Sequence, residues 1–122
     1  MDQINLEFMQ GWPEGWQKQV KEYLAGKRKD FAARPKLVGT GFQKAVWRAI
    51  AKIPYGDTRT YAELARDIGK PKAVRAVGTA CGKNQFPIII PCHRVVGSHG
   101  LGGYAFGLEM KKQLLAIEQR YK

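Results

Sequence analysis

Residues 87–95 read Pro-Ile-Ile-Ile-Pro-Cys-His-Arg-Val and place a cysteine beside a histidine, directly after an apolar run. Three consecutive isoleucines favour a buried, extended backbone, and the flanking prolines prevent a helix. Cys92 therefore follows a rigid segment that can aim a reactive atom, and His93 is an adjacent base that can help to generate a thiolate. The alternative is a structural cysteine, because free cysteines are often buried.

Length and charge narrow the class of protein. The chain has 122 residues, enough for one domain with one core. It carries 21 Lys and Arg against 10 Asp and Glu, and this net charge of +11 favours nucleic acid as a partner over an anionic membrane. Neither a membrane-spanning stretch nor a signal peptide is visible, so we expect a cytoplasmic protein, or a nuclear one in a eukaryote.

The two cysteines, Cys81 and Cys92, lie eleven residues apart. A disulfide between them is disfavoured in a reducing compartment. Together with His93 and His99 they could be considered as metal ligands, but adjacent Cys-His residues do not match the usual zinc spacings. We therefore expect no metal and no cofactor.

The N-terminal part is expected to contain one helix. Residues 4–8 alternate apolar and polar side chains as in a short strand, although their spacing also fits one face of a helix. Apolar residues at helical spacing from Trp16 to Leu24 predict an amphipathic helix that ends at Gly26. Residues 30–39 are typical of a connecting loop.

Two capping boxes predict the starts of the next two helices. The first begins at Thr40 and ends in a turn at residues 54–57, and its buried stripe comprises Phe42, Val46, Ile50 and Ile53. The second begins at Thr60 and is short, because Gly69 ends it. A third helix is predicted from Lys72 to about Gly82, with Pro71 at its first position.

Two short helices joined by a tight turn indicate a helix-turn-helix. The second helix is covered by small residues, and Arg75 is the one long side chain in the middle of that face. Such a face suits a DNA minor groove, but it also suits packing against another helix. The charge favours DNA, since residues 58–96 hold seven Lys or Arg against two acids.

The C-terminal part predicts a loop followed by a helix. Residues 97–107 contain five glycines, so their backbone can approach a ligand closely, and Tyr104 and Phe106 project from this loop. The last helix runs from Leu108 to about Arg120. It would turn Glu118 inward, where a carboxylate needs a partner.

Four motifs in order, VWRAIAKIPYGDTRTYAELA, KAVRAVGTACGKN, PIIIPCHRVV and GGYAFGLEMKKQLLAIE, closely resemble the O6-alkylguanine-DNA alkyltransferases over about residues 41–118. The resemblance implies a mainly α, winged helix-turn-helix-like fold with little or no sheet. It also implies a monomer that repairs double-stranded DNA by flipping an alkylated guanine and transferring its alkyl group, once and irreversibly, to a cysteine.

The resemblance implies a role for each matching residue. Cys92 matches the acceptor thiol, His93 the base that acts through a water, and Glu118 the carboxylate that orients the imidazole. Tyr61 matches the phenol that protonates the leaving guanine. Asn84 matches the hinge between the recognition helix and the active-site segment.

Arg75 matches the finger that fills the space left by the flipped nucleotide. The implied DNA-binding surface further includes Tyr61, Thr60, Ala73, Ala76, Lys72 and Arg94. The implied base pocket comprises Val95, Tyr104, Ala105 and Phe106. In this pocket the Ala105 N–H would donate to the base oxygen, and the carbonyls of Cys92 and Val95 would hold the guanine amino group.

The sequence also departs from the family pattern. Members usually carry a separate N-terminal domain with a small sheet, whereas residues 1–38 can supply one helix and at most one strand. We therefore expect that domain to be absent or truncated, and residues 39–122 to form the DNA-binding and alkyl-acceptor domain. Phe106 stands where the family often has glycine, and Gln85 where it often has proline.

Two other functional classes stay open. Short alkyltransferase-like proteins bind damaged DNA without transfer, but they typically replace the cysteine that is present here as Cys92. A winged-helix transcription regulator would leave the set of Cys92, His93 and Glu118 unexplained.

Overall fold

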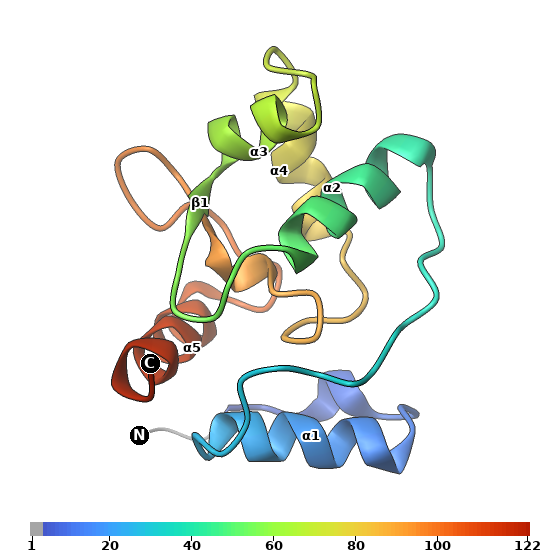
Figure 1. Cartoon of the computed structure of the whole chain (residues 1–122), viewed down its shortest axis with the longest axis vertical. Coiled ribbons are helices and arrows are strands. Elements are labelled where there is room, and N and C mark those ends of the chain that lie inside the picture. Colours follow the sequence, from blue (N-terminus) through green and yellow to red (C-terminus); the bar gives the residue numbers. More distant parts are fainter. Residues whose placement is uncertain (1–3) are drawn as a thin grey trace.

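Helices dominate the computed structural model, which describes residues 4–122 (Figure 1). Its α-helices are α1 (Glu14–Leu24), α2 (Gly41–Ala51), α3 (Tyr61–Asp67), α4 (Val74–Gly82) and α5 (Leu108–Arg120). Two short 3-10 helices are η1 (Glu7–Met9) and η2 (Cys92–Arg94). The sheet found among these residues consists of β1 (Arg59–Thr60) and β2 (Val95–Val96). The expected mainly α class with little sheet is confirmed.

The small sheet joins the helix pair to the cysteine segment. β1 and β2 are parallel, with Arg59 opposite Val95 and Thr60 opposite Val96. Thr60 is also the residue that caps α3. Backbone pairing therefore holds the start of α3 beside the residues that follow Cys92.

The helix starts follow local hydrogen bonding. Both predicted capping boxes are confirmed: the Thr40 hydroxyl accepts from the Gln43 N–H at 3.0 Å, and the Thr60 hydroxyl accepts from the Glu63 N–H at 3.0 Å. The predicted start of α4 at residues 71–72 is wrong. The N–H of Ala73 donates to the carbonyl of Lys70 at 2.9 Å, so a turn precedes the helix.

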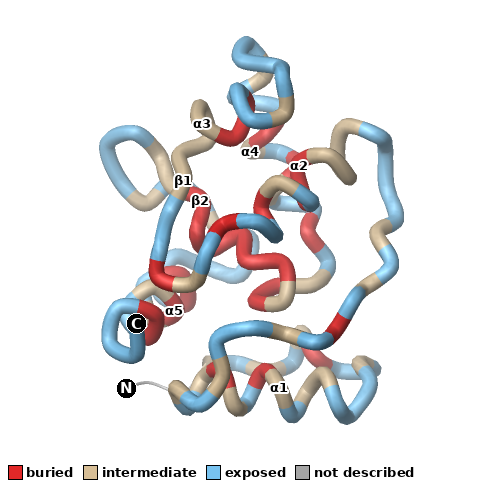
Figure 2. The backbone as a smooth tube through the Cα atoms, viewed as in Figure 1, coloured by how far each residue is buried: buried red, intermediate tan, exposed pale blue. Residues whose placement is uncertain are grey.

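Two clusters of buried side chains form the core, and Figure 2 shows buried segments where the helices face the centre of the molecule. The first cluster lies among α2, α3, α4 and the Cys92 segment. There the indole N–H of Trp47 donates to the carbonyl of Ala80 at 2.9 Å and ties α2 to α4. Its remaining buried members are Val46, Ile50, Ile53, Leu64, Ala65, Val77, Ile90, Cys92 and Val95.

The second cluster joins the N-terminal segment to the rest of the chain. Val20 and Tyr23 of α1 pack with Ile88 and with Met110 and Leu114 of α5. In Figure 1 α1 lies across one end of the molecule, and a long connection leads from it to α2. The N-terminal part of the described chain thus shares a core with residues near its C-terminal end.

Two expectations for local structure are wrong. Residues 4–8 do not form a strand, because the chain turns into η1 and buries Met9; residues 1–3 lie outside the described part. The isoleucines are not extended either, although Ile88 and Ile90 are buried as expected. Ile88 has a φ of 74°, and the N–H of Ile90 donates to the Phe86 carbonyl at 2.9 Å, which closes a turn.

None of the helices within residues 4–122 combines the length and the apolar character that crossing a membrane requires.

Candidate active site

Cys92 begins η2, and its side chain is almost fully buried. Its Sγ accepts a hydrogen bond from Asn84 Nδ2 at 3.1 Å, and the same amide group donates to the Ile90 carbonyl at 2.9 Å. The Asn84 Oδ1 accepts from the N–H of Phe86 at 2.9 Å. One buried amide therefore links the residues after α4, the isoleucine turn and the thiol.

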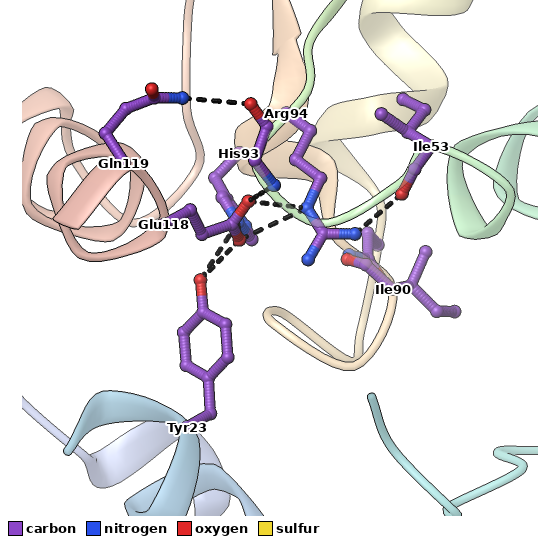
Figure 3. Close-up of polar contacts among 9 residues, drawn as sticks. Tyr23, Ile53, Ile90, His93, Arg94, Glu118 and Gln119 are labelled. Carbon is purple, nitrogen blue, oxygen red and sulfur yellow. Dashed lines mark hydrogen bonds and ion pairs between the residues drawn. The ribbon is translucent and has the colours of Figure 1, made fainter. Parts of the chain in front are cut away.

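Glu118 is the centre of a polar network that includes His93, the residue after Cys92 (Figure 3). Its Oε2 lies 2.5 Å from His93 Nε2 and accepts from the Tyr23 hydroxyl at 2.5 Å. Its Oε1 accepts from Arg94 Nε at 2.9 Å and from the Gly56 N–H at 3.0 Å. Burial would raise the pKa of Glu118, but these donors outweigh it and lower the pKa to about 2. The carboxylate is therefore ionised at neutral pH.

His93 is fully buried, and its two ring nitrogens differ. Nε2 faces Glu118, whereas Nδ1 has no hydrogen-bond partner among the described residues. Burial lowers the pKa of His93, and Glu118 opposes this shift only in part. The neutral ring therefore holds its proton on Nε2, towards the carboxylate, and keeps a free lone pair on Nδ1.

The Cys92 thiol needs such a base. The neighbouring thiol of Cys81 and burial raise the pKa of Cys92 well above its usual value, while Asn84 and Lys111 act in the opposite direction. The resting side chain is therefore a protonated thiol, which is a weak nucleophile until a base removes its proton.

Cys92 lines a cavity of about 190 Å³. The other lining residues are Tyr61, Gly78, Cys81, Gly82, Gly103, Tyr104 and Ala105. The Tyr61 hydroxyl accepts from the Gly103 N–H at 3.2 Å, which joins α3 to the glycine-rich loop. Gly102 has a φ of +71°, and a Cβ there would lie 2.7 Å from Tyr61, so this approach requires glycine.

Lys111 holds the glycine-rich loop in place. Its side chain is fully buried, and its ammonium donates to the carbonyls of Val95 at 2.6 Å, Leu101 at 2.5 Å and Gly103 at 2.9 Å. The sequence analysis did not select this residue. The available signal was its position on α5, three residues before Leu114 and seven before Glu118, on the buried face.

Tyr23 is the second residue that the sequence analysis missed as part of the site. Tyr23 belongs to the apolar residues whose spacing predicted the amphipathic helix, and its side chain is buried. Its partner Glu118 is 95 residues away in the chain, so no local pattern could identify the contact.

The expected DNA-binding residues fall into two groups. Lys72, Arg75 and Ala76 are exposed, and Ala73 is half-buried beside them. Thr60 and Tyr61 lie at the start of α3, where the Thr60 hydroxyl serves the helix cap. The small face of α4 is thus open to solvent around one long cationic side chain.

Arg94 lies in the interior rather than on that surface. It is 6% exposed, pairs with Glu118, and donates from Nη1 to the Ile53 carbonyl at 2.7 Å. A guanidinium held in this way cannot reach a phosphate. The expected DNA contact of Arg94 is therefore replaced by a structural ion pair with Glu118.

Two expected pocket residues lie outside the cavity lining. The Phe106 ring packs against Phe8, with centroids 5.9 Å apart, and against Tyr104 at 5.7 Å. Val95 is fully buried, and its carbonyl already accepts from Lys111. Of the four expected pocket residues, Tyr104 and Ala105 line the cavity.

No group of three or more His, Cys, Asp or Glu side chains within residues 4–122 is arranged to hold a metal ion.

A helix pair with exposed cationic side chains lies beside a buried thiol and a histidine–carboxylate pair, an arrangement that suits a DNA-binding domain with a reactive cysteine. The family model described as the DNA-binding domain of 6-O-methylguanine DNA methyltransferase matches residues 41–120. The chain therefore belongs to the 6-O-methylguanine DNA methyltransferase family.

Named relatives agree with this assignment. The chain is 53% identical over 102 residues to the methylated-DNA–protein-cysteine methyltransferase of Methanosarcina acetivorans, an alignment that covers 83% of this chain and 65% of the relative. It is 52% identical over 103 residues to the inducible enzyme of that name from Bacillus subtilis. This alignment covers 84% of this chain and 58% of the relative. The chain thus spans less than two thirds of the length of these relatives.

Solved structures show the same fold. The structure of Mycobacterium tuberculosis OGT in complex with DNA matches with a TM-score of 0.86 and 47% identity, over 88% of this chain and 68% of that chain. Atl1 from S. pombe, in complex with damaged DNA containing O6-carboxymethylguanine, matches with a TM-score of 0.60 and 32% identity. This match covers 68% of this chain and 80% of that chain.

Proposed function

We propose that this protein repairs duplex DNA by transferring the alkyl group of O6-alkylguanine to Cys92, once per molecule and irreversibly. The observation that carries the proposal is the position of Cys92, which lines a cavity and directly precedes, in η2, the histidine that is paired with Glu118. The names of the relatives support the same activity.

His93 and Glu118 would activate the thiol. His93 Nδ1, which has no partner in the described structure, accepts the Cys92 proton through a water molecule, and the ionised Glu118 stabilises the imidazolium that forms. The thiolate then attacks the alkyl carbon bound to O6. The S–C bond forms as the C–O bond breaks, and the electron pair passes into the guanine ring.

Tyr61 would supply a proton to the leaving guanine. Burial is the main cause that raises the pKa of Tyr61, so the phenol keeps its proton at neutral pH and can donate it. Over the whole reaction the thiol proton ends on guanine, and the alkyl group ends on sulfur. No group in this scheme removes the alkyl group from sulfur, so each molecule reacts once, and no cofactor is required.

The α4 surface would bring the base to the thiol. Small residues at positions 73 and 76 let α4 approach the minor groove, while Arg75 fills the space of the extruded nucleotide and Lys72 contacts phosphate. Asn84 then connects this helix to Cys92. The flipped base enters the cavity beside Tyr104, with the Ala105 N–H as the donor to its oxygen.

One thiol and one cavity in a chain suffice for this reaction. We therefore propose that the protein acts as a monomer on double-stranded DNA, in the cytoplasm, or in the nucleus if it comes from a eukaryote.

Mass spectrometry after incubation with a methylated-guanine duplex tests the proposal. The peptide that contains Cys92 should gain one methyl group per protein molecule, and the peptide that contains Cys81 should gain none. Cys92→Ser should abolish labelling and keep duplex binding. Multiple turnovers or labelling confined to Cys81 would refute the proposal, and binding without labelling would indicate the damage-binding class instead.

A further inference from the structure

Tyr23 lies outside residues 41–120, the part that matches the family model, yet its hydroxyl touches Glu118. We propose that Tyr23 is a positioning residue of the alkyl-acceptor site. It fixes the Glu118 carboxylate and, through it, the form of His93 that can accept a proton at Nδ1. The inference rests on the proposed function, because it concerns the base of that reaction.

The Tyr23 hydroxyl contacts both members of the Glu118–His93 pair. The hydroxyl donates to Glu118 Oε2 at 2.5 Å and lies 3.2 Å from His93 Nε2 (Figure 3). The side chain has no exposed surface. Its ring packs against Phe31 at a centroid distance of 5.8 Å and against Tyr55 at 6.0 Å, so the hydroxyl is held in one place.

The protonation states show what Tyr23 does. Glu118 is ionised and can only accept, so the Tyr23 hydroxyl must be the donor. Burial and the charge of Glu118 raise the pKa of Tyr23 far above its usual value, so the phenol stays protonated and takes no part in proton transfer. Its effect is to hold Oε2 in front of His93 Nε2.

The other donors to Glu118 cannot replace this effect. The Gly56 N–H binds Oε1, and Arg94 Nε lies 2.9 Å from Oε1 and 3.1 Å from Oε2. Without Tyr23 only these two donors hold the carboxylate, which can then turn and move Oε2 away from the imidazole. A weaker Nε2–H···Oε2 bond makes Nδ1 a weaker base, because less positive charge is stabilised on the ring.

Helix α1 therefore builds part of the site. Val20 of this helix packs in the same cluster as Ile88, Met110 and Leu114. These contacts fix the position of α1, and therefore of Tyr23, relative to Glu118. The N-terminal segment contributes a hydroxyl that positions the Glu118 carboxylate, in addition to covering the core.

The test compares Tyr23→Phe with the matched control Tyr55→Phe. The Tyr55 hydroxyl is also buried but has no hydrogen-bond partner in the described structure, and its ring packs on Tyr23. The readouts are the single-turnover rate of Cys92 methylation by methylated duplex from pH 5.5 to 9.5, the rate of Cys92 carbamidomethylation by iodoacetamide, and duplex affinity.

We expect Tyr23→Phe to slow both Cys92 reactions about tenfold at neutral pH, a loss typical of one hydrogen bond to a charged group. The acid limb of the pH–rate profile should shift to lower pH, because a weaker base is protonated only at lower pH. Duplex affinity should stay unchanged. Tyr55→Phe should stay within about twofold of the parent on every readout. Equal losses in the two variants, or an unshifted profile for Tyr23→Phe, would overturn the inference.

A measurement on the unsubstituted protein covers the case in which Tyr23→Phe does not fold. Two-bond ¹H–¹⁵N correlations of His93 report its tautomer, and we expect a proton on Nε2 with Nδ1 bare. A proton on Nδ1 would overturn the inference. If the parent protein fails to methylate Cys92 from duplex, the proposed function fails, while iodoacetamide reactivity and the tautomer still decide the role of Tyr23.

Discussion

His93 Nε2 lies 2.5 Å from Glu118 Oε2, and neither side chain has more than 1% of its surface exposed. Solvent therefore screens the electrostatic interaction between the two side chains very little, so each one strongly influences the protonation of the other. The other ring nitrogen of His93, Nδ1, has no hydrogen-bond partner among the described residues. This asymmetry directs the basic lone pair of the imidazole away from Glu118.

Replacing Glu118 with Gln should lower both activity and stability. The transfer rate should fall about 100-fold or more, because the imidazolium loses its counter-charge. Unfolding in urea should show a loss of about 3–5 kcal/mol, since Arg94 is left buried without an anion. As a control, Arg59→Gln breaks exposed pairs with Glu63 and Asp67 and should cost less than about 1 kcal/mol. Equal costs would contradict the buried-pair interpretation.

Stability should decrease as the pH falls below about 6.5. The pKa of His93 is lowered in the folded state, so below the ordinary value of 6.5 the unfolded chain binds a proton that the folded chain excludes. A second loss should follow from about pH 4.5 to about 2, because Glu118 must be protonated there against its lowered pKa. Urea midpoints measured across this range report both phases.

The assignment of the first phase can be tested with the two histidines. His93→Gln should remove the loss below pH 6.5, whereas His99→Gln, in an exposed loop, should retain it. A first phase that persists in His93→Gln would show that another group controls it.

Lys111→Met should loosen the glycine-rich loop. The ammonium bonds to three carbonyls, so its removal should cost about 1.5–3 kcal/mol and speed amide hydrogen exchange at residues 97–107. Lys112→Met is a matched control, because the neighbouring lysine is exposed on the same helix. Unchanged exchange in Lys111→Met would show that the glycines hold the loop without it.

Arg75→Ala should impair reaction with methylated duplex more than reaction with the free alkylated base, since only the duplex requires extrusion of the base. Affinity for duplex should fall steeply with salt and depend little on sequence. Lys18 on α1 is also exposed but lies far along the chain from α4, so Lys18→Ala should leave the reaction rates with both substrates unchanged. Similar losses on the two substrates would contradict a finger role for Arg75.

Phe106→Gly should change stability more than substrate choice. The ring packs on Phe8 and Tyr104 outside the cavity lining, so its loss should cost about 1–2 kcal/mol and leave the ratio of benzyl to methyl transfer within about twofold. The ratio comes from Cys92 loss with benzylguanine and with methylated duplex. A selective acceleration of benzyl transfer would show instead that Phe106 limits the size of the alkyl group that Cys92 accepts.

The sequence by itself determined the features that depend on neighbours in the chain. Both capping boxes form as predicted, because their donors and acceptors lie three residues apart. The helical spacing placed Glu118 on the buried face of α5 with Leu114. The adjacency of Cys92 and His93 indicated a thiol with a base, since both side chains belong to the same short segment.

Only the tertiary structure decided which distant groups meet. Tyr23 reaches Glu118 across 95 residues, and Arg94 turns inward because Glu118 and the Ile53 carbonyl offer it partners that a surface would not. Phe106 leaves the pocket because Phe8 supplies an apolar neighbour. A local pattern states whether a side chain prefers to be buried. Its partners depend on how the helices pack, because buried charges such as those of Arg94 and Glu118 must find each other in the packed interior.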